Sequence, residues 1–146
     1  MEQITIEDFD WDLYAELSKS VVTIDQNDIP KELAEQAYRY SMYHGFLMSA
    51  KHLYDLSVHH LDRFVAVTTK ETRADWIVRG KKTTDKATEA YVTATDEYNR
   101  LHEDVIKYNY KVGLLKGLVS SLEQRHSMLV QLSSNQRSET KLYAQN

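Results

Sequence analysis

The chain has 146 residues and a formal net charge of −4, and it contains no cysteine, only four glycines and a single proline. The lack of cysteine excludes disulfides, thiolate metal sites and a cysteine nucleophile. The scarcity of helix-breaking residues favours long helices. No apolar run reaches the roughly 20 residues that a membrane-spanning helix needs. Because the first residues are acidic, unlike a secretory signal, we expect a cytoplasmic protein with no membrane contact.

The N-terminal part of the chain is acidic. Residues 1–32 carry nine acidic and two basic side chains, a balance of −7, whereas the rest carries thirteen acidic and sixteen basic ones, a balance of +3. Residues 7–19 are predicted to form a short amphipathic helix, residues 21–24 an extended segment and residues 25–28 a turn. We expect residues 1–29 to form an acidic segment that packs on the body of the protein.

A long helix is predicted from residue 30 to about residue 78. Its apolar face is broad enough to serve two neighbouring helices. Gly80 is expected to end this helix as its C-cap, and a basic connection follows. A short helix is then predicted over residues 85–93, capped by one of the two threonines before it. We group residues 30–94 as the long helix, the connection and the short helix.

The last predicted helix carries a heptad seam, in which apolar residues alternate in steps of four and three. Its members are Leu101, Val105, Tyr108, Val112, Leu115, Val119, Leu122 and Leu129. The stepping passes through His126 before Leu129. Thr95 is expected to cap this helix, which we predict to run to about residue 133 before a polar tail. Gly113 and Gly117 lie beside the seam and predict the close crossing of another helix.

The seam has a consequence for the whole architecture. A single helix cannot bury such a stripe, so the chain must bring up a second helix of its own, other subunits, or both. We expect residues 95–146 to form an oligomerisation helix and tail, with the seam residues at the interface. The sequence thus predicts an all-α fold: a long helical hairpin, a short N-terminal helix, and a heptad helix that assembles into an oligomeric bundle or ring.

Two groups of side chains have the composition of catalytic or metal sites. One is a stripe of the long helix that carries two histidines and two aspartates: His52, Asp55, His59 and Asp62. It lies opposite the apolar face, so we expect it to be solvated and to hold no metal. Glu32 and Glu35 resemble the acidic pair of some helical nucleotide hydrolases, but no second pair follows at a suitable spacing. We therefore expect no enzyme activity and no cofactor.

Basic residues gather around the connection and form the predicted nucleic-acid interface. They are Arg63, Lys70, Arg73, Arg79, Lys81, Lys82 and Lys86. Trp76 lies within this run and Tyr91 just beyond it. Cationic groups attract phosphates, and an aromatic ring can stack on an unpaired base. The alternative interpretation is a solvated connection between helices. In an oligomer each subunit would repeat the patch, so that weak phosphate contacts add up.

The order of elements and three stretches of the chain resemble the phage recombination mediator proteins of the UvsY type. The stretches are Glu16-Leu17-Ser18-Lys19 through Val22-Thr23-Ile24-Asp25, Glu32-Leu33-Ala34 running to Tyr40-Ser41, and Leu114-Leu115-Lys116-Gly117-Leu118 through Leu122, Arg125 and Leu129. The resemblance implies a ring of subunits that acts in DNA recombination and repair without an enzymatic step.

Mediators of this family bind single-stranded DNA and contact both a single-strand-binding protein and a RecA-like recombinase. They help the recombinase replace the other protein on the strand. The family's DNA-binding lysines and arginines lie near the end of the long first helix, which corresponds here to the region from Arg63 to Lys82. From the residues alone, the alternative function is a coiled-coil scaffold or phage assembly protein that oligomerises without binding DNA.

Overall fold

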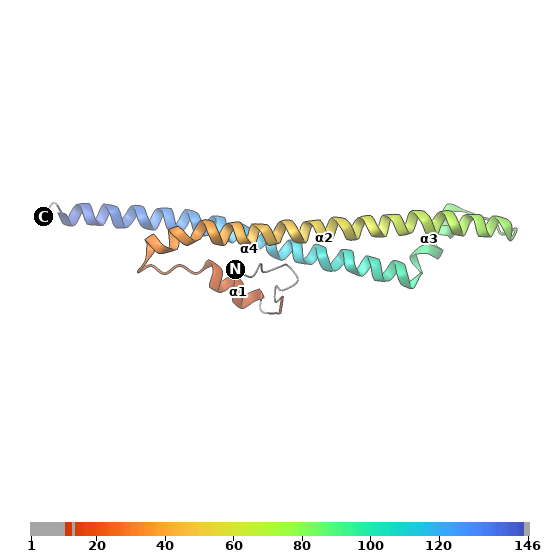
Figure 1. The fold of residues 1–146 in the computed structure, drawn as a ribbon, viewed down its shortest axis with the longest axis horizontal. Coiled ribbons are helices and arrows are strands. Elements are labelled where there is room, and N and C mark those ends of the chain that lie inside the picture. Colours follow the sequence, from red (N-terminus) through yellow and green to blue (C-terminus); the bar gives the residue numbers. More distant parts are fainter. Residues whose placement is uncertain (1–10, 13, 145–146) are drawn as a thin grey trace. The chain divides into compact units, whose positions relative to one another are not determined.

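The computed structural model describes residues 11–12 and 14–144 and consists of four helices (Figure 1). In chain order these are α1 (Tyr14–Val22), α2 (Ile29–Val78), α3 (Asp85–Thr93) and α4 (Asp96–Ala144). The predicted all-α fold is confirmed. None of the helices in the described part of the chain is long and apolar enough to cross a membrane.

The chain forms two compact units. Unit 1 combines the chain up to Ser49 with the chain from Gly113 onward, and unit 2 comprises residues 50–112. The first half of α2 and the second half of α4 belong to unit 1, and their other halves belong to unit 2 together with α3. Neither long helix is therefore confined to one unit.

In unit 1, α2 and α4 lie side by side and antiparallel (Figure 1). The Gln36 side chain on α2 donates from Nε2 to the Leu122 carbonyl on α4, at 2.7 Å. The buried apolar side chains of the two helices include Tyr43, Phe46, Leu47, Leu115, Leu118, Val119, Leu122 and Leu129. Each such side chain contributes about 1.5–3 kcal/mol on burial, so this pairing is the main source of stability in unit 1.

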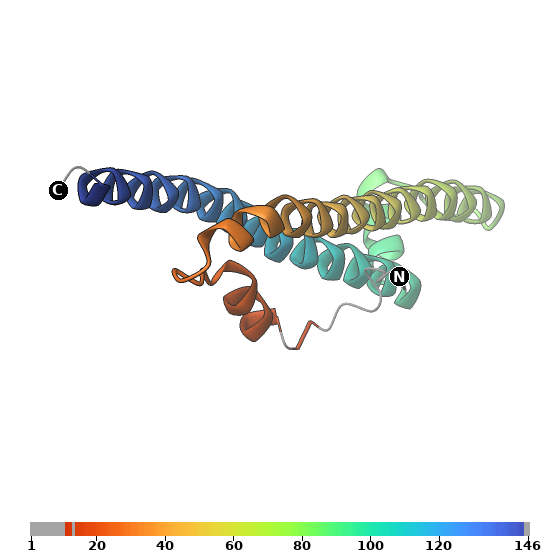
Figure 2. The ribbon, with the colours of Figure 1, turned by 60° about the vertical axis from the view of Figure 1, so that its left-hand side comes forward.

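Helix α1 packs against both long helices of unit 1 (Figure 2). The Tyr14 hydroxyl donates to the Leu114 carbonyl on α4 at 2.7 Å, and Arg39 Nη1 on α2 donates to the Val21 carbonyl at 3.2 Å. The helix ends later than predicted, because Val21 and Val22, expected to be extended, form its last residues. Burial of the Val21 side chain favours the helical conformation at this end. Residues 7–10 and 13 of the predicted helix lie outside the described residues, and Trp11 and Asp12 are not helical, so that part of the prediction is wrong.

The turn predicted over residues 25–28 is confirmed. The Asp25 side chain accepts a hydrogen bond from the Asn27 amide at 2.9 Å, and the Asp28 amide donates to the Asp25 carbonyl at 3.3 Å. A short polar side chain that bonds to the backbone two residues on is the usual device of such a turn. Helix α2 then begins at Ile29, and its end at Val78 agrees with the prediction.

In unit 2 the second half of α2 packs with α3 and the first half of α4. The buried residues there are Ala50, Ser57, Thr72, Thr88, Val92, Leu101 and Val112. Thr95 caps α4 as predicted, since its hydroxyl oxygen accepts from the Tyr98 amide at 3.2 Å. Acidic side chains follow in the first turn, at Asp96 and Glu97, where the helix dipole favours negative charge.

Helix α4 continues to Ala144, so the prediction of an end near residue 133 is wrong. No glycine or proline follows Gly117, and nothing in the covalent chain therefore stops the helix. Beyond Leu129 none of the described residues is buried.

The heptad seam of α4 is covered largely by the chain itself. Six of its eight residues are buried, and Val105 and Tyr108 are half-buried. Leu115, Leu122 and Leu129 have no exposed surface at all. The chain itself therefore supplies the second helix that the seam requires. The fully buried seam residues offer no surface to another subunit, whereas an interface that includes the half-buried Val105 and Tyr108 stays a prediction.

The buried line of α4 also departs from the heptad stepping after Leu122. It passes through Arg125, whose side chain is 1 % exposed, whereas His126 is exposed. An α-helix drifts relative to an exact 3.5-residue repeat, so either residue could have faced inward. Arg125 is the one with partners, because its guanidinium donates to the Glu32 carboxylate and to Gln36 Oε1 on α2. A buried charge requires such partners.

Gly113 and Gly117 do not mark the close helix crossing that was predicted. A Cβ atom added at either position would meet no atom of the described chain within 4 Å.

Candidate nucleic-acid interface

The end of α2 positions the first residues of the connection. Gly80 has φ of +66°, and its amide donates to the Ile77 carbonyl at 3.0 Å. The Lys81 amide donates to the Trp76 carbonyl at 2.8 Å. These two bonds form a Schellman motif, which confirms the predicted C-cap role of Gly80. They fix Lys81 directly after the helix, where the negative end of the helix dipole favours a cation.

The start of α3 positions the other end of the connection. Thr84 is extended, with φ of −126° and ψ of 151°, and its hydroxyl oxygen accepts from the Ala87 amide at 3.2 Å. It is therefore the N-cap of α3. Thr88 and Val92 on α3 have no exposed surface, which anchors this short helix in unit 2. The connection is thus held by a cap at each end.

Two of the seven predicted basic residues are paired with carboxylates. Arg73 on α2 forms an ion pair with Asp85 on α3, and Arg79 Nε donates to Asp75 Oδ1 at 2.9 Å. Both pairs are exposed and contribute at most about 1 kcal/mol each. The other five residues are exposed and form no ion pair within residues 11–12 and 14–144: Arg63, Lys70, Lys81, Lys82 and Lys86.

The structure brings only part of the basic run together. Lys81 and Lys82 are neighbours in the connection, and Lys86 follows in the first turns of α3. Arg63 lies on α2 about 22 Å before its end, and Lys70 about 12 Å before it, at 1.5 Å per residue. The connection is therefore the centre of the candidate interface, and Arg63 stands apart from it.

Two aromatic side chains meet beside the connection. The rings of Trp76 on α2 and Tyr91 on α3 lie 5.7 Å apart between centroids, with an angle of 68° between their planes. This is an edge-to-face contact. Trp76 is half-buried, whereas Tyr91 is 52 % exposed. The turn from α2 into α3 creates this pair, so residue spacing alone did not reveal it.

The other two constellations both lie on α2. The stripe of histidines and aspartates on α2 is exposed, as expected: His52, Asp55, His59 and Asp62. No group of three or more potential metal ligands occurs among the described residues. Glu32 pairs with Arg125, and Glu35 Oε2 accepts from Arg39 Nη2 at 2.8 Å. These two carboxylates are therefore engaged by arginines within the fold.

Comparison with known proteins gives no match: no protein-family model, no curated protein and no solved structure corresponds to the chain. The likeness to UvsY-type mediators rests on the order of elements and the short stretches that carry it.

Proposed function

We propose that the protein is a single-stranded DNA-binding mediator of phage recombination. It would help a RecA-like recombinase replace a single-strand-binding protein on the strand. The observation that carries this proposal is the lysine pair Lys81 and Lys82, which is exposed, free of ion pairs among the described residues, and held between two helix caps. Phosphates bind such a pair by charge and release counterions as they do so.

The proposed mechanism contains no covalent step and is not enzymatic. A strand held on several such patches would be kept in a shape that suits the recombinase better than the single-strand-binding protein. The protein would then act through coupling free energy between its ligands. One patch offers few phosphate contacts, so useful affinity depends on repetition of the patch in an oligomer.

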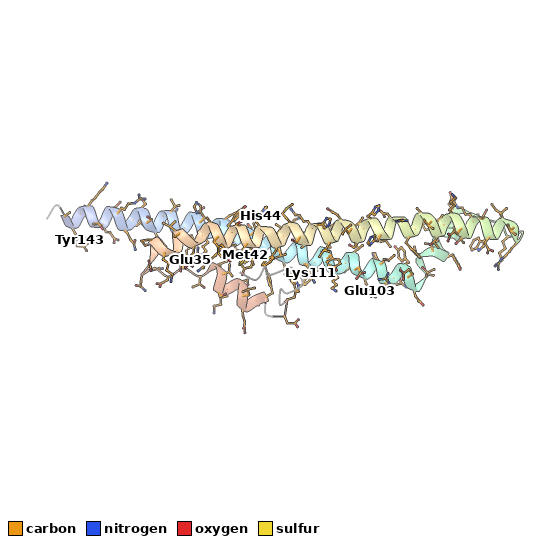
Figure 3. All side chains as sticks on the ribbon, viewed as in Figure 1. Glu35, Met42, His44, Glu103, Lys111 and Tyr143 are labelled. Atoms are coloured by element: carbon orange, nitrogen blue, oxygen red, sulfur yellow. The ribbon has the colours of Figure 1, made fainter. Side chains whose placement is uncertain are left out.

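The proposal includes a homo-oligomer, in the form of a ring. Because the chain's own helices fill the seam of α4, subunits would meet through faces that remain exposed. The exposed large apolar side chains of α4, including Tyr143 in Figure 3, are Ile106, Tyr110, Met128, Val130, Leu142 and Tyr143. Most helical stability in proteins comes from packing of an apolar face, so the exposed apolar side chains of α4 favour a partner along this helix.

A scaffold or phage assembly protein that does not bind DNA is the second candidate. The pairs Arg73–Asp85 and Arg79–Asp75 favour it, because they engage two of the seven basic residues with carboxylates. Such a protein would oligomerise in the same way, and the remaining lysines would only be solvated.

Salt-dependent binding to a single-stranded oligonucleotide separates the two candidates. The test variant is Lys81→Ala/Lys82→Ala, and the control is Lys116→Ala/Lys141→Ala, which removes the same charge from exposed positions on α4. We expect only the test variant to bind more weakly. Its slope of log affinity against log salt should fall by about 1.4, or about 0.7 for each lost phosphate contact.

Equal weakening by both variants would show that the lysine pair has no special role. An absence of binding by the wild type at low salt would leave only the scaffold. The mediator role has its own test: ATP hydrolysis by a RecA-like recombinase on a strand covered by single-strand-binding protein. We expect the wild type to raise this rate and the Lys81→Ala/Lys82→Ala variant to raise it less. A wild type without effect would contradict mediation even if DNA binds.

A further inference from the structure

We propose that the Tyr91 ring, supported by Trp76, is a stacking surface for one unpaired base of the bound strand. This inference rests on the proposed function and names the contact that would make the patch prefer a single strand. In a duplex the bases are stacked on one another, so the ring would find no free base face. Aromatic rings beside a positively charged groove are the common design of single-strand sites.

Tyr91 has the exposure and the support that stacking needs. The residue is 52 % exposed, although Thr88 and Val92 on the same helix have no exposed surface. The edge-to-face contact with Trp76, at 5.7 Å between centroids, holds the ring in place. A side chain fixed before binding loses little conformational freedom when a base stacks on it.

The lysine pair lies next to the backbone of Trp76. The Lys81 amide donates to the Trp76 carbonyl at 2.8 Å, so the backbone of the connection starts beside the aromatic pair. Asp85, the first carboxylate after the lysines, forms an ion pair with Arg73. A strand with its phosphates on Lys81 and Lys82 would therefore begin beside the aromatic pair.

The experiment compares oligothymidylate with an abasic oligonucleotide of the same length and charge. The variants are Tyr91→Leu, which removes the ring, and Tyr91→Phe, which keeps it. Tyr38→Leu is the matched control, because Tyr38 is 68 % exposed and lies on α2 away from the connection. We expect Tyr91→Leu to weaken binding of oligothymidylate about tenfold and to leave abasic binding unchanged. The other two variants should bind both oligonucleotides like the wild type.

Abasic binding also reports on folding, since it uses the lysines of the same connection. Loss of affinity for both oligonucleotides in Tyr91→Leu, or for neither, would overturn the stacking proposal. The proposed function would still stand if the lysine variant lost affinity in the same assay. A wild type that binds neither oligonucleotide would overturn both proposals.

Discussion

Arg125 on α4 donates a hydrogen bond to the carboxylate of Glu32 on α2, and the two residues lie 93 positions apart in the chain. Their side chains are 1 % and 12 % exposed. The same guanidinium donates to Gln36 Oε1 and, at 3.3 Å, to the Thr23 carbonyl just after α1. One buried side chain thus ties together three segments of unit 1 and fixes the register of α2 on α4.

Removal of the Arg125 charge is expected to destabilise the protein strongly. Arg125→Met keeps much of the apolar volume but leaves Glu32 as a largely buried carboxylate without its main partner. The free energy of unfolding should fall by about 3–5 kcal/mol, as measured by urea denaturation. The double variant with Glu32→Leu should recover much of this loss, because no unpaired charge then remains.

Arg100→Met is the control for this prediction. Arg100 forms ion pairs with Glu97 and Asp104, but its side chain is 60 % exposed. Exposed pairs contribute little, so we expect a loss below about 1 kcal/mol. Equal losses in Arg125→Met and Arg100→Met would mean that the buried pair does not hold unit 1 together.

Two glycine substitutions are expected to change stability in opposite directions. Gly117→Ala should raise the free energy of unfolding by about 1 kcal/mol, because a Cβ meets nothing within 4 Å and alanine favours the helix. Gly80→Ala should lower it by about 1–2 kcal/mol, since the φ of +66° at this position strains any residue with a Cβ. Thermal or urea denaturation measures both. A stabilising Gly80→Ala would contradict the Schellman geometry.

The cap at Thr84 is expected to hold α3 in place. Thr84→Ala removes the oxygen that accepts from the Ala87 amide and should cost about 1 kcal/mol. Hydrogen exchange should show faster exchange of the first amides of α3. Thr83→Ala is the matched control, since Thr84 alone of the two is the N-cap. Faster exchange after Thr83→Ala instead would place the cap one residue earlier.

Lowering the pH is expected to remove the stabilisation that ionised Glu97 contributes in the first turn of α4. Hydrogen bonds from Arg100 lower the pKa of the Glu97 carboxyl below its ordinary value of 4.5, more than burial raises it. The folded state therefore favours the ionised form. The resulting stabilisation is present above the ordinary pKa and is lost as the pH falls through the lowered one. In Arg100→Met, NMR titration should place the Glu97 midpoint higher than in the wild type. An unchanged midpoint would contradict the assigned cause.

Sequence signals located the ends of helices well where the determinants are local. Gly80, Thr84 and Thr95 each act through backbone groups within five residues, so their roles could be read from the chain. The end of α1 was less accessible, because Val21 and Val22 favour a strand by residue type. Burial of the Val21 side chain and the hydrogen bond from Arg39 to the Val21 carbonyl favour the helical conformation instead.

The pairing of polar residues could not be predicted, because it depends on contacts between distant segments. Arg125 lies three residues after Leu122 and four before Leu129, a spacing that allows an inward position. Only the approach of Glu32 makes that position favourable for a charge. In the same way, the turn into α3 sets Arg73 against Asp85, whereas Lys81 and Lys82 form no ion pair with any residue that the structure describes.

Light scattering tests subunit assembly and DNA binding together, because it measures the mass in solution with and without a single-stranded oligonucleotide. We expect the wild type to have a mass that is a multiple of the 17.0 kDa chain and to gain mass when the oligonucleotide is added. The Lys81→Ala/Lys82→Ala variant should keep the multiple and lose most of the gain. A well-folded particle of 17.0 kDa at micromolar concentration, unchanged by the oligonucleotide, would contradict both the oligomer and the DNA-binding role.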